Sequence, residues 1–256
     1  MLSILKYNIP LDLDSPERTV FHRDIIRKKR FLRKLYEEWY SILSRYKPAF
    51  PEGKIVEIGS GGGFLKEVEP AVICSDVLEL PGNDLTFSAL EMPFEDEELS
   101  VLFMIDTFHH IPDAGKFLKE AERVLAPGGA VIMIEPANSL WGRFIYKNFH
   151  HEPFEPEGDW TIPSSGPLSG ANGALPWIVF ERDQAVLQAE YPGFEIEEIS
   201  YHTPFRYLVS GGVSFKQLVP GFTYGFFSGL DKFLASLWPQ LSMFVTIRLK
   251  KKDESR

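Results

Sequence analysis

The sequence predicts an α/β fold in which a glycine-rich turn joins a buried parallel strand to a helix. Residues 54–63 read KIVEIGSGGG, an apolar run followed by the turn. Further short apolar runs alternate along the chain with segments of helical periodicity, an order typical of parallel strands joined by helices. The chain has 256 residues, of which 44% are hydrophobic, so it can form one domain with a sizeable core.

The turn after the first strand carries Gly59, Gly61 and Gly63 in the pattern G-x-G-x-G. Glycines let the backbone turn sharply and approach a ligand closely. A helix over 64–68 would direct its free N–H groups at that ligand. The segment therefore predicts a nucleotide-type cofactor at the carboxyl edge of the sheet, although a tight turn that binds nothing also favours glycine. Phe64 occupies the sixth position of the pattern, where the dinucleotide pattern G-x-G-x-x-G has glycine, so NAD fits poorly.

The elements that follow have the spacing of a parallel sheet. The apolar run 72–75 ends at Asp76, one βα unit after the glycines, where an acid can accept hydrogen bonds from both hydroxyls of a ribose. We expect further strands over 85–89, 101–105, 130–134, 194–201 and 243–250. We expect amphipathic helices over 116–125, ended by Pro127-Gly128-Gly129, and over 180–191.

Residues 53–136 resemble the small-molecule branch of the class I S-adenosylmethionine-dependent methyltransferases. The motifs are E-x-G-x-G-x-G from Glu57, the ribose acid Asp76, A-x-x-M-P-F at 89–94, H-H-x-P-D at 109–113 and L-x-P-G-G at 125–129. The resemblance implies a three-layer, Rossmann-like sheet of seven strands that is mostly parallel, with strand seven antiparallel between strands five and six. It also implies S-adenosyl-L-methionine as the cofactor and S-adenosyl-L-homocysteine as the product.

The resemblance also assigns the cofactor site. The methionine end would lie against Glu57, Gly59, Ser60, Gly61 and Gly63, and the ribose against Asp76 and Val77. The adenine would be bordered by Ser88, Ala89 and Leu90, and the reacting end by Asp106 and Thr107. Two positions depart from the family pattern, because Ser88 stands where Asp is common and Met92 where Leu is usual.

The candidate catalytic residues are His109, His110 and Tyr146. A histidine after the fourth strand could remove a proton from an acceptor hydroxyl, but in the family this pair is often structural. Tyr146 is a candidate base or acceptor contact on position alone. The run His150-His151-Glu152 could supply metal ligands with these histidines. Because adjacent histidines point in different directions and no i,i+4 helical pair is present, we expect no metal site.

Three segments lie outside the cofactor-binding half, residues 51–136, and should determine the acceptor. Residues 1–50 form a helical cap, with apolar periodicity over 16–46. Residues 137–180, rich in aromatics, Pro, Gly and Ser, are expected to form an irregular lid over the acceptor pocket. Residues 202–241, an insertion in the C-terminal half 181–256, are either extra core packing, an apolar acceptor pocket or a surface that rests on lipid.

The cap should also expose a basic face. It is either a solvated surface or a patch for an anionic acceptor or a membrane. This face would hold Arg23, Arg27, Lys28, Lys29, Arg30, Arg33 and Lys34.

Composition excludes several function classes. The net charge of −9 argues against a nucleic-acid partner, because phosphate contacts need Lys and Arg. The one cysteine, Cys74, excludes an intramolecular disulfide and fits a reducing compartment. Met1–Pro10 has no signal-peptide h-region, and no uncharged apolar run reaches the ~18 residues of a spanning helix. We therefore expect a cytoplasmic protein, with contact at a membrane surface left open.

The sequence therefore predicts methyl transfer by direct in-line displacement to a small or lipid-linked acceptor. The lid aromatics and the basic helix favour a bulky, apolar and anionic acceptor. Amino-methylating DNA enzymes carry [DN]-P-P-[YF] after strand four, where this chain has D-T-F-H, and the Pro-Cys pair of cytosine-C5 enzymes is absent. The alternatives are a non-catalytic cofactor-binding scaffold and a NAD-dependent oxidoreductase. The oligomeric state is not predicted.

Overall fold

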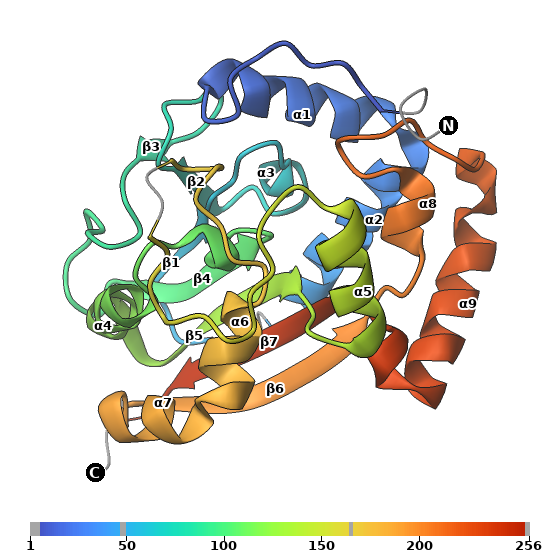
Figure 1. Ribbon diagram of the computed structural model, residues 1–256. Coiled ribbons are helices and arrows are strands. Elements are labelled where there is room, and N and C mark those ends of the chain that lie inside the picture. The colour runs from blue at the N-terminus through green and yellow to red at the C-terminus, as the bar shows by residue number, and fades with distance from the viewer. Residues whose placement is uncertain (1–5, 47–49, 164–165, 254–256) are drawn as a thin grey trace.

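The computed structural model describes residues 6–46, 50–163 and 166–253. Among these residues the strands form one seven-stranded sheet in the order β3-β2-β1-β4-β5-β7-β6, with helices on both faces (Figure 1). β1 to β5 pair in parallel, whereas β7 pairs antiparallel with both β5 and β6. The predicted Rossmann-like sheet with an antiparallel seventh strand is confirmed. The strands are β1 Lys54–Ile58, β2 Val72–Asp76, β3 Leu85–Thr86, β4 Leu99–Ile105, β5 Leu125–Pro136, β6 Phe194–His202 and β7 Phe244–Lys251.

The helices cover the sheet in two groups. One core packs α4 and α7 against the sheet through Phe117, Leu118 and Leu187, and the other packs α2 through Leu32, Leu35 and Trp39. Successive residues of β4 alternate between these cores, as the period of a strand requires. The helices are α1 Pro16–Lys28, α2 Arg30–Ser44, α3 Leu65–Val68, α4 Ala114–Val124, α5 Leu140–Phe149, α6 Leu175–Trp177, α7 Gln184–Glu190, α8 Arg206–Ser210 and α9 Tyr224–Leu237.

The N-terminal helical segment differs from the prediction. It is two helices, α1 and α2, separated at Lys29, whose backbone is extended. Lys29 does not belong to an exposed basic face. It is buried, and its ammonium group donates hydrogen bonds to the carbonyls of Ser210, Gly212 and Phe215. A buried ammonium needs such acceptors, and they come from a turn far along the chain.

Two further segments are more helical than predicted. The expected irregular lid contains α5, whose N-cap Ser139 accepts a hydrogen bond from the Gly142 amide. The expected helix over 180–191 begins at Leu175 and passes through a π-helical turn, Ile178–Arg182, before α7. Within the described residues, no helix combines the length and hydropathy needed to cross a bilayer.

Parts of several sequence-based predictions lie outside the described residues. They are residues 1–5 and 47–49 of the helical cap, the former also in the stretch judged to lack a signal peptide, residues 164–165 of the lid, and residues 254–256 of the C-terminal half.

The strand order creates a crevice at one edge of the sheet. From β1 the sheet extends through β2 and β3 on one side and through β4 and β5 on the other. At such a switch point the loops that leave neighbouring strands diverge, and ligands of open α/β sheets bind there. The carboxyl ends of β1, β2 and β4 all lie at this edge.

Candidate functional site

A cavity of about 570 Å³ lies at this edge of the sheet. Its size falls within the range of small-molecule sites, about 300–1,000 Å³. Segments outside the sheet complete its walls, among them α1, α2, residues 150–152, residues 166–170 and residues 207–214. Its lining includes every residue predicted to hold the cofactor, namely Glu57, Gly59, Ser60, Gly61, Gly63, Asp76, Val77, Ser88, Ala89, Leu90, Asp106 and Thr107.

The glycine turn is shaped by close approaches on two sides. Gly59 has a left-handed φ of 68°, and a Cβ there would lie 2.3 Å from Thr107 Cγ2. Gly62 faces α1, where a Cβ would lie 2.9 Å from the backbone nitrogen of Arg23. The Arg23 guanidinium donates to the carbonyl of Gly61 at 2.9 Å. The turn therefore touches the loop after β4 on one side and α1 on the other.

Two amide donors at the start of the helix predicted over 64–68 are engaged within the protein. α3 is a single turn of four residues. The amide of Gly63 donates to the Ser60 carbonyl at 2.7 Å, and the amide of Phe64 donates to the Tyr40 hydroxyl at 2.7 Å. These two donors are therefore already satisfied within the protein.

Glu57 is the second-last residue of β1, beneath the turn, and is almost completely buried. Burial raises the pKa of its carboxyl group to about 7, although Ser60 and Cys74 oppose the rise through hydrogen bonds. The thiol of Cys74, itself buried, lies 3.6 Å from Glu57 Oε2 as a hydrogen-bond donor.

Asp76 ends β2 on the opposite side of the turn. Its Oδ2 accepts the amide of Gly61 at 3.0 Å and its Oδ1 accepts the amide of Leu78 at 3.0 Å. Each carboxylate oxygen has two acceptor sites, so both oxygens keep capacity for a ligand's hydroxyl groups. Burial raises the pKa of Asp76, and these backbone hydrogen bonds act in the opposite direction.

The loop after β4 is organised by Glu135, a residue that the sequence analysis did not single out. Glu135 is fully buried at the end of β5. Its Oε1 accepts the amides of Thr107 and Phe108 at 2.8 and 2.7 Å, and its Oε2 lies 2.7 Å from His109 Nδ1. In the sequence, this role is indicated only by the position of Glu135 as an acid directly after an apolar run, in VIMIEP.

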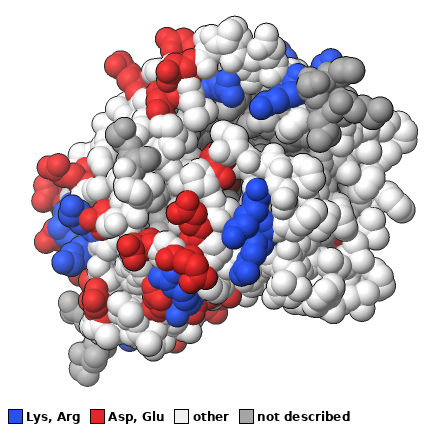
Figure 2. All heavy atoms as spheres, viewed as in Figure 1, with Lys and Arg blue, Asp and Glu red and all other residues white. Residues whose placement is uncertain are grey.

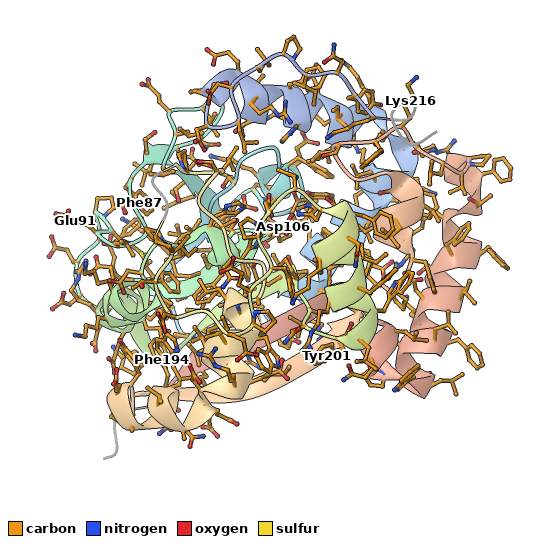
Figure 3. The ribbon with its side chains drawn as sticks, in the orientation of Figure 1. Phe87, Glu91, Asp106, Phe194, Tyr201 and Lys216 are labelled. Carbon is orange, nitrogen blue, oxygen red and sulfur yellow. The ribbon has the colours of Figure 1, made fainter. Side chains whose placement is uncertain are left out.

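Asp106 begins this loop and lies near the middle of the view in Figure 3. Its φ of 54° is left-handed, which is unfavourable for a residue other than glycine. Such strain is concentrated at functional sites. Burial raises the pKa of Asp106 to about 7, while the neighbouring His109 lowers it.

The candidate catalytic residues occupy three different environments. His110 lines the cavity, whereas His109 is buried behind the lining. Burial lowers the pKa of His109, but hydrogen bonds to Glu135 and Glu152 hold it well above the ordinary value. Burial and the nearby His109 lower the pKa of His110 to about 4. Tyr146 lies outside this lining, and its hydroxyl donates to the carbonyl of Met243 at 2.7 Å, which opposes its use as a base.

Glu152 brings the histidines of two segments together, a grouping that the sequence analysis named as a possible set of metal ligands. Its carboxylate lies 3.3 Å from His109 Nε2, 3.9 Å from His110 Nε2, 3.5 Å from His150 Nδ1 and 3.7 Å from His151 Nε2. Among the residues that the structure describes, two sets satisfy the spacing of metal ligands, His109–His110–Glu152 and His150–His151–Glu152. No two of these residues form an i,i+4 pair along one helix, and they meet through tertiary folding instead.

Comparison with known families agrees with this architecture. Residues 66–133 match the family model described as a methyltransferase domain. A demethylmenaquinone methyltransferase of Symbiobacterium thermophilum is 29% identical over 118 residues, 45% of this chain and 46% of that protein. A chloroplastic tocopherol O-methyltransferase of Arabidopsis thaliana is 44% identical over 46 residues, 18% of this chain and 13% of that protein. The chain thus matches less than half the length of these curated relatives.

Among solved structures, the fold resembles the geranyl diphosphate C-methyltransferase of Streptomyces coelicolor A3(2). The TM-score is 0.51 at 13% sequence identity, covering 96% of this chain and 91% of that one. That enzyme was crystallised with Mg²⁺, geranyl diphosphate and S-adenosyl-L-homocysteine.

Proposed function

We propose that this protein, which has the fold of the class I S-adenosylmethionine-dependent methyltransferases and matches a methyltransferase-domain model, transfers a methyl group from S-adenosylmethionine to a small or lipid-linked acceptor. One observation carries the proposal. The glycine turn, the acid after β2 and the loop after β4 meet in the lining of a single cavity. Each of these features also belongs to the family pattern in the sequence.

The residues of this chain would hold the cofactor along the edge of the sheet. Asp76 accepts the ribose hydroxyls, and the turn from Gly59 to Gly63 lies against the methionine part. Ser88 to Leu90 border the adenine, and Asp106 with Thr107 lies at the reacting end. When bound, S-adenosylmethionine supplies a methyl group on a sulfonium that carries its own leaving group.

The protein's task is then to place an acceptor in line with that methyl group and to exclude water. The walls beyond the cofactor residues are mainly apolar, with Ile111, Pro112, Ile162, Leu168, Tyr207 and Val213. His110 and Glu152 add a polar side to the same cavity. An acceptor with an apolar body and one polar reacting group suits this arrangement, and the relatives named for tocopherol and demethylmenaquinone support it.

Calorimetric titration with S-adenosylhomocysteine, with NADH as the competing ligand, tests the cofactor. We expect saturable binding of the thioether and none of NADH. Asp76→Asn should weaken binding at least about tenfold, because a carboxylate oxygen that accepts a ribose hydroxyl is replaced by a donor. Exposed Glu79, three residues later, offers Glu79→Gln as the matched control with unchanged affinity. Binding of NADH alone, or unchanged affinity in Asp76→Asn, would contradict the proposal.

We further propose that the protein rests on a lipid bilayer through an apolar face formed by α9 and α5. Phe222 and Phe226 are 79% and 71% exposed, and Phe233 and Leu237 continue the same stripe. Leu140, Phe144 and Phe149 are also exposed, on α5. The right-hand face in Figure 2, over α9, carries few charged side chains. Aromatic side chains suit the interface between headgroups and acyl chains, and the same two helices carry exposed cations, Arg143 and Lys147 on α5 and Lys232 on α9.

Co-sedimentation with phosphatidylcholine vesicles tests this face. We expect binding by the wild type and a loss of at least about fivefold in the double variant Phe226→Ser/Phe233→Ser, because each buried aromatic contributes about 1.5–3 kcal/mol. Val186, exposed on α7, gives the control Val186→Ser. No vesicle binding by the wild type would contradict the proposal. A dimer in solution that the double variant disrupts would assign the face to self-association instead.

A further inference from the structure

Glu152 lies at the centre of a cluster of histidines that the cofactor does not require. His109 and His110 come from the loop after β4, and Glu152 comes from the segment after α5. The ligand atoms of these three residues all lie within 4.8 Å of one another. His109 is buried, and the side chains of His110 and Glu152 are 12% and 17% exposed. The cluster is therefore shielded from bulk solvent and open on the side of the cavity.

The hydrogen bonds around the two histidines orient their rings. His110 Nδ1 lies 2.9 Å from the carbonyl oxygen of Gly170, which can only accept, so Nδ1 carries the proton. His109 Nδ1 lies 2.7 Å from the carboxylate of Glu135. In both rings the Nε2 atom is directed at Glu152. A histidine whose Nδ1–H is held by a carboxylate or a carbonyl while Nε2 faces a third group is the usual arrangement of metal-binding histidines.

The spacing of the three ligand atoms also suits a metal. In a tetrahedral zinc site with bonds of about 2.0–2.1 Å, the ligand atoms are separated by about 3.3 Å. His109 Nε2 and Glu152 Oε2 are 3.3 Å apart, and His110 Nε2 and Glu152 Oε1 are 3.9 Å apart. The two distances are to different oxygens of the Glu152 carboxylate, and one ligand atom from each of the three residues lies within 4.8 Å of the others.

We propose that His109, His110 and Glu152 bind one divalent transition-metal ion of the zinc type, with Glu135 and Gly170 orienting the two histidines. Imidazole nitrogens with one carboxylate favour zinc, iron, cobalt or nickel, whereas magnesium and calcium prefer ligand sets made only of oxygen. Three protein ligands leave a coordination position free, the arrangement of a catalytic rather than a structural site.

The free position faces the cavity, because His110 and Glu152 both belong to its lining. The role of the ion rests on the proposed function. It would hold an oxygen atom of the acceptor beside the reacting end of the cofactor site and lower the pKa of an acceptor hydroxyl. The binding of the ion is independent of methyl transfer and can be measured without cofactor or acceptor.

His150 and His151 lie on the other side of the same carboxylate and define the competing ligand set. The side chain of His151 is 46% exposed. Unlike His109 and His110, whose rings are oriented by Glu135 and Gly170, His150 has an Nδ1 that accepts the amide of Glu152 at 3.4 Å. Nδ1 of His150 is therefore occupied by a hydrogen bond from its own segment. The set His109–His110–Glu152, in which both rings are oriented by hydrogen bonds, is the more suitable of the two.

Titration of the chelator-treated, tag-free protein with Zn²⁺ by calorimetry tests the site. We expect one ion per chain. Glu152→Gln and His110→Ala should each weaken binding at least about a hundredfold, since each removes a ligand. Glu155, exposed in the same segment, supplies the control Glu155→Gln, with wild-type affinity. Titration with Co²⁺ should give visible absorption bands of a low-symmetry site containing nitrogen ligands, and both ligand variants should lose them.

Circular dichroism and thermal melting establish that each variant is folded before the titrations are compared. Absence of stoichiometric binding by the wild type would overturn the proposal, and so would wild-type affinity in either ligand variant. Loss of binding in the double variant His150→Ala/His151→Ala, with binding kept in His110→Ala, would move the site to the other histidine pair. A protein that binds Zn²⁺ but not S-adenosylhomocysteine would keep the metal site and refute the proposed function.

Discussion

At the scale of single residues, two buried carboxylates support the cavity in different ways. Glu135 accepts hydrogen bonds from the loop after β4 and from His109, so it couples the end of β5 to the reacting end of the cavity. Glu57 lies beneath the glycine turn, where burial opposes its charge. The oxygens of Glu135 all have hydrogen-bond partners. Ionisation of Glu57, in contrast, would destabilise the folded protein.

Glu135→Gln should destabilise the protein by about 2–4 kcal/mol, because a buried charged acceptor that serves several donors is lost. For a chain of this length that corresponds to a decrease in Tm of roughly 4–16 °C. Thermal denaturation followed by circular dichroism measures the change. The exposed strand residue Glu195 gives the control Glu195→Gln, whose Tm should stay within about 2 °C of the wild type. An equal, small effect in both variants would contradict the role assigned to Glu135.

Glu57 predicts a pH dependence of stability. Its folded-state pKa of about 7 lies above the ordinary value of 4.5. Below about pH 4.5 the carboxyl group is protonated in both states, so it carries no penalty. As the pH rises through about 7, ionisation favours the unfolded chain and stability is lost.

Glu57→Gln should therefore exceed the wild type in unfolding free energy at about pH 8 by on the order of 1–3 kcal/mol, with a much smaller difference at about pH 5. Urea denaturation of both ligand-free proteins at the two pH values measures how the difference in unfolding free energy between variant and wild type changes with pH. A difference that is the same at both pH values would show that Glu57 does not titrate in this range.

At the scale of elements, the break between α1 and α2 depends on a contact with a distant part of the chain. The Lys29 ammonium donates to three carbonyls of the turn after α8, at Ser210, Gly212 and Phe215. Both segments joined by this contact line the cavity. Thr19 and His22 belong to α1, and Val213 and Ser214 belong to the turn. Lys29 thus connects two walls of the candidate site.

Lys29→Met should lower the unfolding free energy by about 2–4 kcal/mol, since it leaves buried carbonyl groups without a donor. Neighbouring Lys28 is exposed and pairs with Asp24 at the surface, so Lys28→Met should change stability by less than about 1 kcal/mol. Chemical denaturation of the two variants compares a buried and an exposed ammonium at adjacent positions. Equal losses would indicate that the contacts of Lys29 contribute nothing beyond those of a surface lysine.

The strands could be predicted from sequence because each is an apolar run at the right spacing, and the antiparallel β7 followed from the family resemblance. The break at Lys29 could not, because the carbonyls that accept its hydrogen bonds are about 180 residues away and periodicity describes only local order. Glu135 was missed for the same reason, and the meeting of Glu152 with His109 and His110 could be named from sequence but not expected. Each becomes part of the site only through side chains from another loop, whereas the glycines and Asp76 belong to one local βα pattern.

At the scale of the whole molecule, the cavity joins segments from most of the chain. α1, the glycine turn, the loop after β4, the segment after α5 and the turn after α8 all contribute lining residues. A ligand that fills the cavity therefore contacts both halves of the protein. Its binding should stabilise the whole domain rather than one loop.

S-adenosylhomocysteine at about a hundred times its dissociation constant should add about 2.7 kcal/mol to the unfolding free energy. That corresponds to an increase in Tm of roughly 5–11 °C for a chain of this size. Differential scanning calorimetry measures it, with NADH at the same concentration as the negative control. An unfolding transition that splits in two, with only one part shifted by the ligand, would contradict a single cooperative domain.

The single cysteine of this chain, Cys74, can be used to follow local opening of the fold by its reaction with thiol-specific reagents. Cys74 is buried in β2 and its thiol faces Glu57, which lines the cavity. Any adduct formed with a thiol-specific reagent must therefore be at this one position, and it forms only when the neighbouring strands separate. The rate of alkylation, followed by mass spectrometry, thus gives the free energy of local opening beneath the glycine turn in the unmodified protein.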